Sequence, residues 1–110
     1  GRMFNRRGLN VFAEELENQA RMLPFVGDVA AVGKRRADGS HDLFLAFSAR
    51  QSPAPAVDFG RELRKFLLQT LPPAKRPRRV AEFAHLPRRD AGKIDYEAVL
   101  RLFGEEDPTG

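Results

Sequence analysis

A glycine followed by a lysine, Gly92-Lys93, stands in a polar stretch just before a predicted helix. Glycine lets a ligand approach the backbone closely, and the lysine ammonium is a mobile point charge, so the pair is suited to phosphate chemistry. A Walker-type phosphate loop is absent from the sequence, because no GxxxxGK run followed by serine or threonine occurs. The dipeptide alone does not decide its role, since a lysine in a polar loop is usually a solvated side chain. The function assigned to Gly92-Lys93 therefore depends on the rest of the chain.

Metal and thiol chemistry find little support in the sequence. There is no cysteine, and the two histidines, His41 and His85, are far apart and in no metal-ligand spacing. We therefore predict no metal site on this chain and expect both histidines at the surface. The lack of cysteine fits a reducing compartment, so we expect a cytoplasmic protein. No stretch approaches the roughly 18 consecutive apolar residues of a membrane helix, and we expect no membrane span.

The charge balance suits an anionic partner. The 110 residues include 19 basic and 15 acidic side chains, a net charge of +4, which would favour a nucleotide, a phosphopantetheine group or nucleic acid. The run Lys75-Arg76-Pro77-Arg78-Arg79 motivates one alternative function, a small nucleic-acid-binding module. The chain has neither the exposed aromatic pattern of RNA-recognition motifs nor a cysteine-histidine finger, which disfavours specific readout. A further alternative is a non-catalytic interaction module.

Apolar periodicity predicts one α+β domain over residues 1–110. We expect a small three-stranded sheet, a short N-terminal strand or turn, and about three helices packed on the sheet. Asp38-Gly39 predicts a hairpin turn between the middle strands, and Asp95 is a candidate N-cap. Residues 104–110 should form a frayed acidic tail. The predicted elements are a strand or turn at 6–11, a helix at 13–23, strands at 29–32 and 43–47, a helix at 58–71, a strand at 78–84 and a helix at 95–103.

Segments spread over nearly the whole chain carry a resemblance to a known family. They are RGLNVFAEELE at 7–17, LPFVGDVAAVG at 23–33, LPPAKRPRRV at 71–80 and LPRRDAGKID at 86–95. In this order they resemble the C-terminal domain of the AMP-forming acyl-CoA synthetase, peptide-synthetase adenylation and luciferase superfamily. Gly1-Arg2 lies closer to Gly8 than the hinge motif of this family does, so we assign no hinge residue.

The resemblance implies a mobile lid of an acid:thiol ligase. Such an enzyme uses ATP, with Mg²⁺ bound mainly by a large domain outside this chain, to convert a fatty or aryl acid to an acyl-adenylate. It then transfers the acyl group to the thiol of coenzyme A or phosphopantetheine. The resemblance implies that Lys93, beside Gly92, is the catalytic lysine of the first step, and that Gly8, Leu9 and Asn10 face the thiol after the lid rotates.

The implied partners are the N-terminal adenylation domain of the same enzyme, the carboxylic acid substrate and an acyl carrier protein. Because the substrate pocket would lie in the large domain, we expect the isolated chain to be inactive. Basic side chains are candidates for contacts with coenzyme A phosphates or an acidic carrier protein, with a solvated basic surface as the alternative. These residues are Arg6, Arg7, Lys75, Arg76, Arg78 and Arg79.

Overall fold

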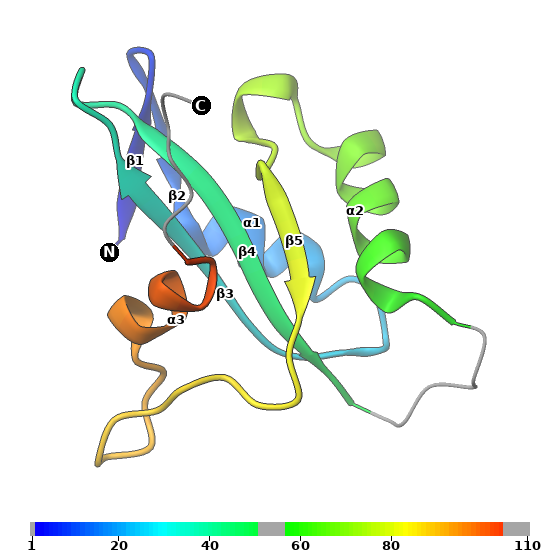
Figure 1. Ribbon diagram of the computed structural model, residues 1–110. Helices are drawn as coiled ribbons and strands as arrows, with labels where there is room; N and C mark the ends of the chain where they lie inside the picture. Colours follow the sequence, from blue (N-terminus) through cyan, green and yellow to red (C-terminus); the bar gives the residue numbers. More distant parts are fainter. Residues whose placement is uncertain (1, 51–56, 105–110) are drawn as a thin grey trace.

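Two sheets and three α-helices make up this computed structural model, which describes residues 2–50 and 57–104 (Figure 1). The predicted α+β class, with its three-stranded sheet, is confirmed. The short strand or turn predicted at residues 6–11 is a two-stranded hairpin that begins at Met3. Most of the predicted tail, residues 105–110, lies outside the described residues. The elements in order are β1 (Met3–Arg6), β2 (Leu9–Phe12), α1 (Ala13–Ala20), β3 (Val26–Arg35), β4 (His41–Ala49), α2 (Phe59–Thr70), the 3-10 turn η1 (Pro73–Lys75), β5 (Arg79–Glu82) and α3 (Tyr96–Leu102).

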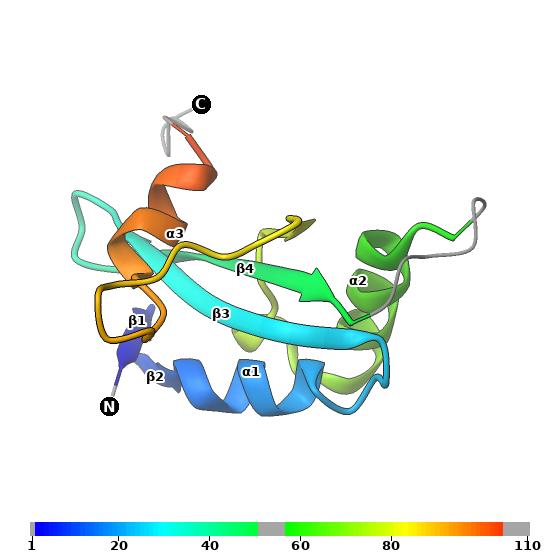
Figure 2. The ribbon, with the colours of Figure 1, turned by 90° about the horizontal axis from the view of Figure 1, so that it is seen from below.

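The larger sheet has the order β3-β4-β5, with β4 antiparallel to β3 and parallel to β5. Helices cover both of its faces: α1 lies below the strands and α3 above them in Figure 2. Alternate side chains of β4 therefore enter two separate cores. Leu43, Leu45 and Phe47 pack with α1 and α2, whereas Phe44 and Ala46 pack with α3. Burial on both faces explains why this strand is a nearly continuous apolar run.

The predicted Asp38-Gly39 turn is present, and the strands that it joins are longer than predicted. Gly39 has φ +87°, a conformation that glycine adopts without steric cost. The Ser40 hydroxyl and the Ser40 backbone N–H both donate to the Asp38 carboxylate. These two hydrogen bonds, of which the one from the hydroxyl has the larger effect, lower the pKa of Asp38. Pairing continues through the charged positions up to Arg35 and His41, which lie opposite each other in the ladder. The prediction from apolar periodicity did not include these polar ends of β3 and β4.

One histidine differs from the surface position predicted for it. His85 is exposed, but His41 is partly buried. The backbone N–H of Asn5 donates to His41 Nδ1 at 3.0 Å, and the imidazole meets the Phe4 ring edge-on with 5.6 Å between ring centroids. His41 therefore connects β1 to the start of β4.

Gly33 allows β1 to approach β3 closely. A Cβ atom at this position would lie 2.6 Å from Cδ1 of Phe4, a buried residue of the core. We expect Gly33→Ala to lower the free energy of unfolding by about 1–3 kcal/mol, because the ring must move. Thermal melting checks this, with Gly60→Ala as the control, since a Cβ there would come no closer than 3.5 Å to any atom. Equal melting temperatures for the two variants would contradict the prediction.

Candidate functional site

Lys93 lies in a small closed loop between β5 and α3. The Arg89 N–H donates to the Lys93 carbonyl at 2.7 Å, and the Gly92 N–H donates to the Arg89 carbonyl at 2.8 Å. Arg88 and Ile94 form an antiparallel bridge across the base of this loop. Gly92 has φ +81°, so the tight turn before Lys93 suits glycine. We call residues 86–95 the lysine loop.

The lysine loop is fixed to the domain at both ends. Leu86 is buried, and Ile94 packs partly buried against the same core as α3. Asp95 caps α3, as predicted, by accepting a hydrogen bond from the Ala98 N–H at 3.1 Å. Lys93 itself is exposed, and its ammonium has no partner among the residues that the structure describes. The loop thus presents an available positive charge on a well-supported backbone.

The glycine turn joins β1 and β2. Arg7 and Gly8 are its two central residues, with φ values of +54° and +88°, which is the signature of a type I′ hairpin. The Gly8 N–H donates to the Asn5 side-chain oxygen at 2.9 Å. Gly8, Leu9 and Asn10 are all exposed, so each is accessible to a ligand.

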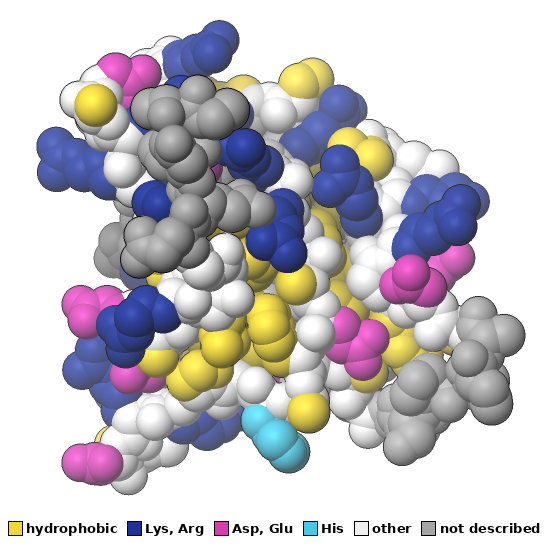
Figure 3. Space-filling view, in the orientation of Figure 1, with side chains coloured by type: hydrophobic (Ala, Val, Ile, Leu, Met, Phe, Trp, Pro, Cys, Tyr) yellow, Lys and Arg dark blue, Asp and Glu magenta, His cyan; other side chains and the backbone are white. Residues whose placement is uncertain are grey.

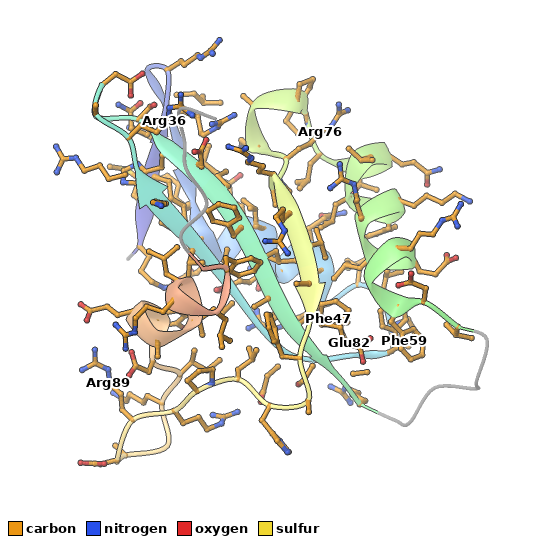
Figure 4. The ribbon with its side chains drawn as sticks, viewed as in Figure 1. Arg36, Phe47, Phe59, Arg76, Glu82 and Arg89 are labelled. Carbon is orange, nitrogen blue, oxygen red and sulfur yellow. The ribbon has the colours of Figure 1, made fainter. Side chains whose placement is uncertain are left out.

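The structure does not bring the two predicted sites together. The glycine turn lies at the upper end of the molecule in Figure 1, and the lysine loop lies at the lower end. Figure 4 labels Arg89 in the lysine loop, at the lower end of the same view. Lys93 and Gly8 therefore belong to two separate surfaces of one domain.

Most of the basic candidates already contact other groups of the domain. Side chains of this type gather over the upper part of the face in Figure 3. The hydrogen bond from the Lys75 ammonium is the main reason that the pKa of Glu15 is lowered. This internal pairing weakens the case for a solvated strip that binds nucleic acid. The contacts join Arg6 to the carbonyls of His41 and Ala74, Lys75 to Glu15, Arg76 to the Leu71 carbonyl, Arg78 to Asp42 and Arg79 to the Phe103 ring.

A partly buried ion pair near the start of the chain was not predicted. Arg2 donates two hydrogen bonds of 2.8 Å to the Glu17 carboxylate and one of 2.8 Å to the Ala31 carbonyl. Its guanidinium also lies 3.6 Å from the centre of the Tyr96 ring. Glu17 is only 3% exposed and accepts a further hydrogen bond from the Ala31 N–H at 2.9 Å. The sequence feature that could have predicted this ion pair is a charged residue on the apolar face of α1, because Glu17 follows Ala13 at helical spacing.

The part of the chain that the structure describes shows neither a metal-binding cluster nor a membrane-spanning helix. Residues 2–50 and 57–104 contain no group of three His, Asp or Glu side chains arranged to hold a metal ion. No helix within these ranges combines the length and the apolar character needed to cross a bilayer.

Comparison with known proteins places this architecture among large synthetases. No protein-family model matches the chain. It is 38% identical over 99 residues to an isonitrile lipopeptide synthase of Streptomyces coeruleorubidus, a match that covers 90% of this chain and 6% of that protein. The chain also superimposes on the amide bond synthetase McbA from Marinactinospora thermotolerans with a TM-score of 0.76 and 25% identity, covering 92% of this chain and 20% of that one.

A second solved structure is an ATP-bound chimera of BclM and MatB, the latter from Rhodopseudomonas palustris. It matches with a TM-score of 0.72 and 27% identity, over 90% of this chain and 19% of the chimera. The chain therefore spans about a fifth of these solved synthetases and a much smaller part of the lipopeptide synthase.

Proposed function

Because this chain has the fold of a domain of AMP-forming acyl-CoA and amide synthetases, as its sequence predicted, we propose that it is the mobile C-terminal lid of such an enzyme. In this proposal Lys93 is the catalytic lysine of acyl-adenylate formation. The observation that carries it is an exposed ammonium without a partner in the described residues, held on a loop that is fixed at both ends. The ATP-bound relative supports ATP as the co-substrate.

In the first half-reaction an oxygen of the carboxylic acid attacks the α-phosphate of ATP and pyrophosphate leaves. Negative charge builds on the oxygens around phosphorus, and the Lys93 ammonium would stabilise it. This interaction is stronger in the transition state than in the ground state, so it raises the rate more than it tightens ATP binding. Mg²⁺ would supply further charge neutralisation. In this proposal the large domain, outside this chain, would bind most of this ion.

In the second half-reaction a thiol attacks the acyl carbon and AMP leaves. We propose that this step uses the opposite end of the domain, where Gly8, Leu9 and Asn10 are exposed. A single rigid domain can present only one of two opposite ends to one active site. Rotation of the lid would therefore exchange the lysine loop for the glycine turn. The thiol would belong to coenzyme A or to the phosphopantetheine of a carrier protein.

Deletion of this domain tests the proposal. We expect the isolated chain to catalyse no acid-dependent exchange of pyrophosphate into ATP, because the acid and the adenine would bind to the large domain. The full-length enzyme should catalyse this exchange with at least one member of a panel of fatty and aryl acids. The measurement is incorporation of labelled pyrophosphate into ATP by the intact enzyme, by the enzyme without residues 1–110 and by the chain alone.

The control is omission of the carboxylic acid, which should reduce exchange by the intact enzyme to background. An enzyme without this domain that exchanges pyrophosphate as fast as the intact protein would rule out a catalytic lid. Steeply salt-dependent binding of the chain to random DNA or RNA, without any effect on exchange, would favour the nucleic-acid-binding alternative.

A further inference from the structure

Arg88 joins the lysine loop to strand β3. Its Nη1 donates to the Gly92 carbonyl at 2.7 Å, and its Nη2 donates to the Asp28 carboxylate, with which it forms an ion pair. One planar guanidinium therefore holds two acceptors that belong to different parts of the domain. A lysine at this position has a single nitrogen and could not reproduce the fork.

Asp28 provides a fixed attachment point on the sheet. It lies in β3, where the pairing with β4 shifts between Val26 and Val29. Its own backbone N–H donates to the Ser48 hydroxyl at 3.1 Å, so this irregular part of the strand is tied to β4. Since β3 and β4 contribute residues to both cores, the backbone that carries Asp28 belongs to the central part of the domain.

The Gly92 carbonyl belongs to the peptide group whose nitrogen is that of Lys93. A hydrogen bond to this oxygen therefore fixes the plane of the peptide from which Lys93 begins. Glycine at φ +81° has more backbone freedom than other residues, so this peptide needs an external restraint. Arg88 supplies that restraint from the rigid sheet.

We infer that Arg88 is a positioning residue for Lys93, and that Asp28 acts through Arg88. This inference rests on the proposed function, in which Lys93 stabilises the adenylation transition state. Both side chains of the ion pair are 44% exposed, and exposed ion pairs contribute little to folding stability. Loss of Arg88 should therefore alter the placement of the lysine loop and leave the rest of the domain folded.

The first test is kinetic and uses the full-length enzyme. Arg88→Gln is expected to lower kcat for acid-dependent pyrophosphate exchange by roughly ten- to a hundredfold, because a displaced catalytic group loses rate steeply. The KM for ATP should change little, and thioester formation from supplied acyl-adenylate should be unaffected. Asp28→Asn should act in the same direction. The double variant should be no slower than Arg88→Gln alone, since both substitutions break one connection.

Arg101→Gln is the matched control. Arg101 lies in the last turn of α3, outside the lysine loop, is exposed, and its side chain makes no hydrogen bond or ion pair with the described residues. Its substitution should leave exchange close to the original rate. Equal rates for the Arg88 and Arg101 variants would overturn the inference.

The second test is structural and does not depend on catalysis. In the 110-residue chain, Arg88→Gln should shift the amide resonances of Gly92 and Lys93 and speed hydrogen exchange of the Gly92 amide, at an unchanged melting temperature. Unchanged amides would overturn the inference. If Lys93→Ala abolishes exchange and Arg88→Gln does not, the inference fails and the proposed function stands. If Lys93→Ala has no effect on exchange, the proposed function fails, and the role of Arg88 in catalysis fails with it.

Discussion

Replacing Lys93 with alanine in the full-length enzyme is expected to slow acid-dependent pyrophosphate exchange by a factor of about 10²–10³. The ammonium would act on charge that develops at the α-phosphate, so the loss should fall on kcat, with little change in the KM for ATP. Thioester formation from supplied acyl-adenylate should survive, because the glycine turn lies at the other end of the domain. Exchange kinetics and single-turnover thioester formation measure the two half-reactions separately.

Lys65→Ala is the control for this experiment. Lys65 is also exposed but lies on α2, away from the lysine loop, so its removal tests the loss of one positive charge without the loss of the proposed catalytic group. Equal damage to both half-reactions by Lys93→Ala would mean that Lys93 has a structural role. Unchanged exchange would remove it from the chemistry altogether.

Replacing Glu17 with alanine is expected to lower the free energy of unfolding by about 2–4 kcal/mol, a large share of the stability of an ordinary domain. The substitution removes the carboxylate that accepts hydrogen bonds from Arg2 and from the Ala31 N–H. The Ala31 N–H would stay fully buried without its acceptor, and that desolvation is the main cost; Arg2, whose side chain is 29% exposed, would lose its ion pair. Urea denaturation followed by circular dichroism gives the free energy.

Glu14→Ala is the matched control on the same helix. Glu14 lies in the first turn of α1 and is exposed, so its removal should change the free energy of unfolding by only a few tenths of a kcal/mol. Glu17→Gln should cost less than Glu17→Ala, because an amide oxygen still accepts a hydrogen bond. Similar unfolding curves for the Glu14 and Glu17 alanine variants would contradict the role given to the ion pair.

Local signals in the sequence predicted most of the elements. Asp38-Gly39 predicted a hairpin and Asp95 predicted a helix start, because each acts through bonds to neighbouring residues. Gly8 likewise marked a turn, although the left-handed conformation of Arg7 was not foreseen. The first helix is shorter than predicted and ends at Ala20, because the apolar side chain at Leu23 packs from a turn and not from the helix.

Contacts between distant residues could not be predicted from the same signals. Arg88 and Asp28 are 60 positions apart, and so are Lys75 and Glu15. Periodicity shows which face of an element is apolar, but the partner of a charged side chain depends on which strands become neighbours. The parallel pairing of β4 with β5, across α2, was one such unknown. The sequence predicted a polar loop before the last helix, and the structure has one, whereas the residues that support this loop emerged only from the fold.

The contacts that Arg2 and Glu17 make with Ala31 also cover part of the outer edge of the larger sheet. β3 is the outer strand of its sheet, and an outer strand of ten residues offers free N–H and C=O groups to a strand from another molecule. At Ala31 both groups are already occupied, one by the Glu17 carboxylate and the other by the Arg2 guanidinium. Two charged side chains thus cover the middle of this sheet edge, and we expect their loss to leave backbone groups of β3 open to β-pairing with another molecule.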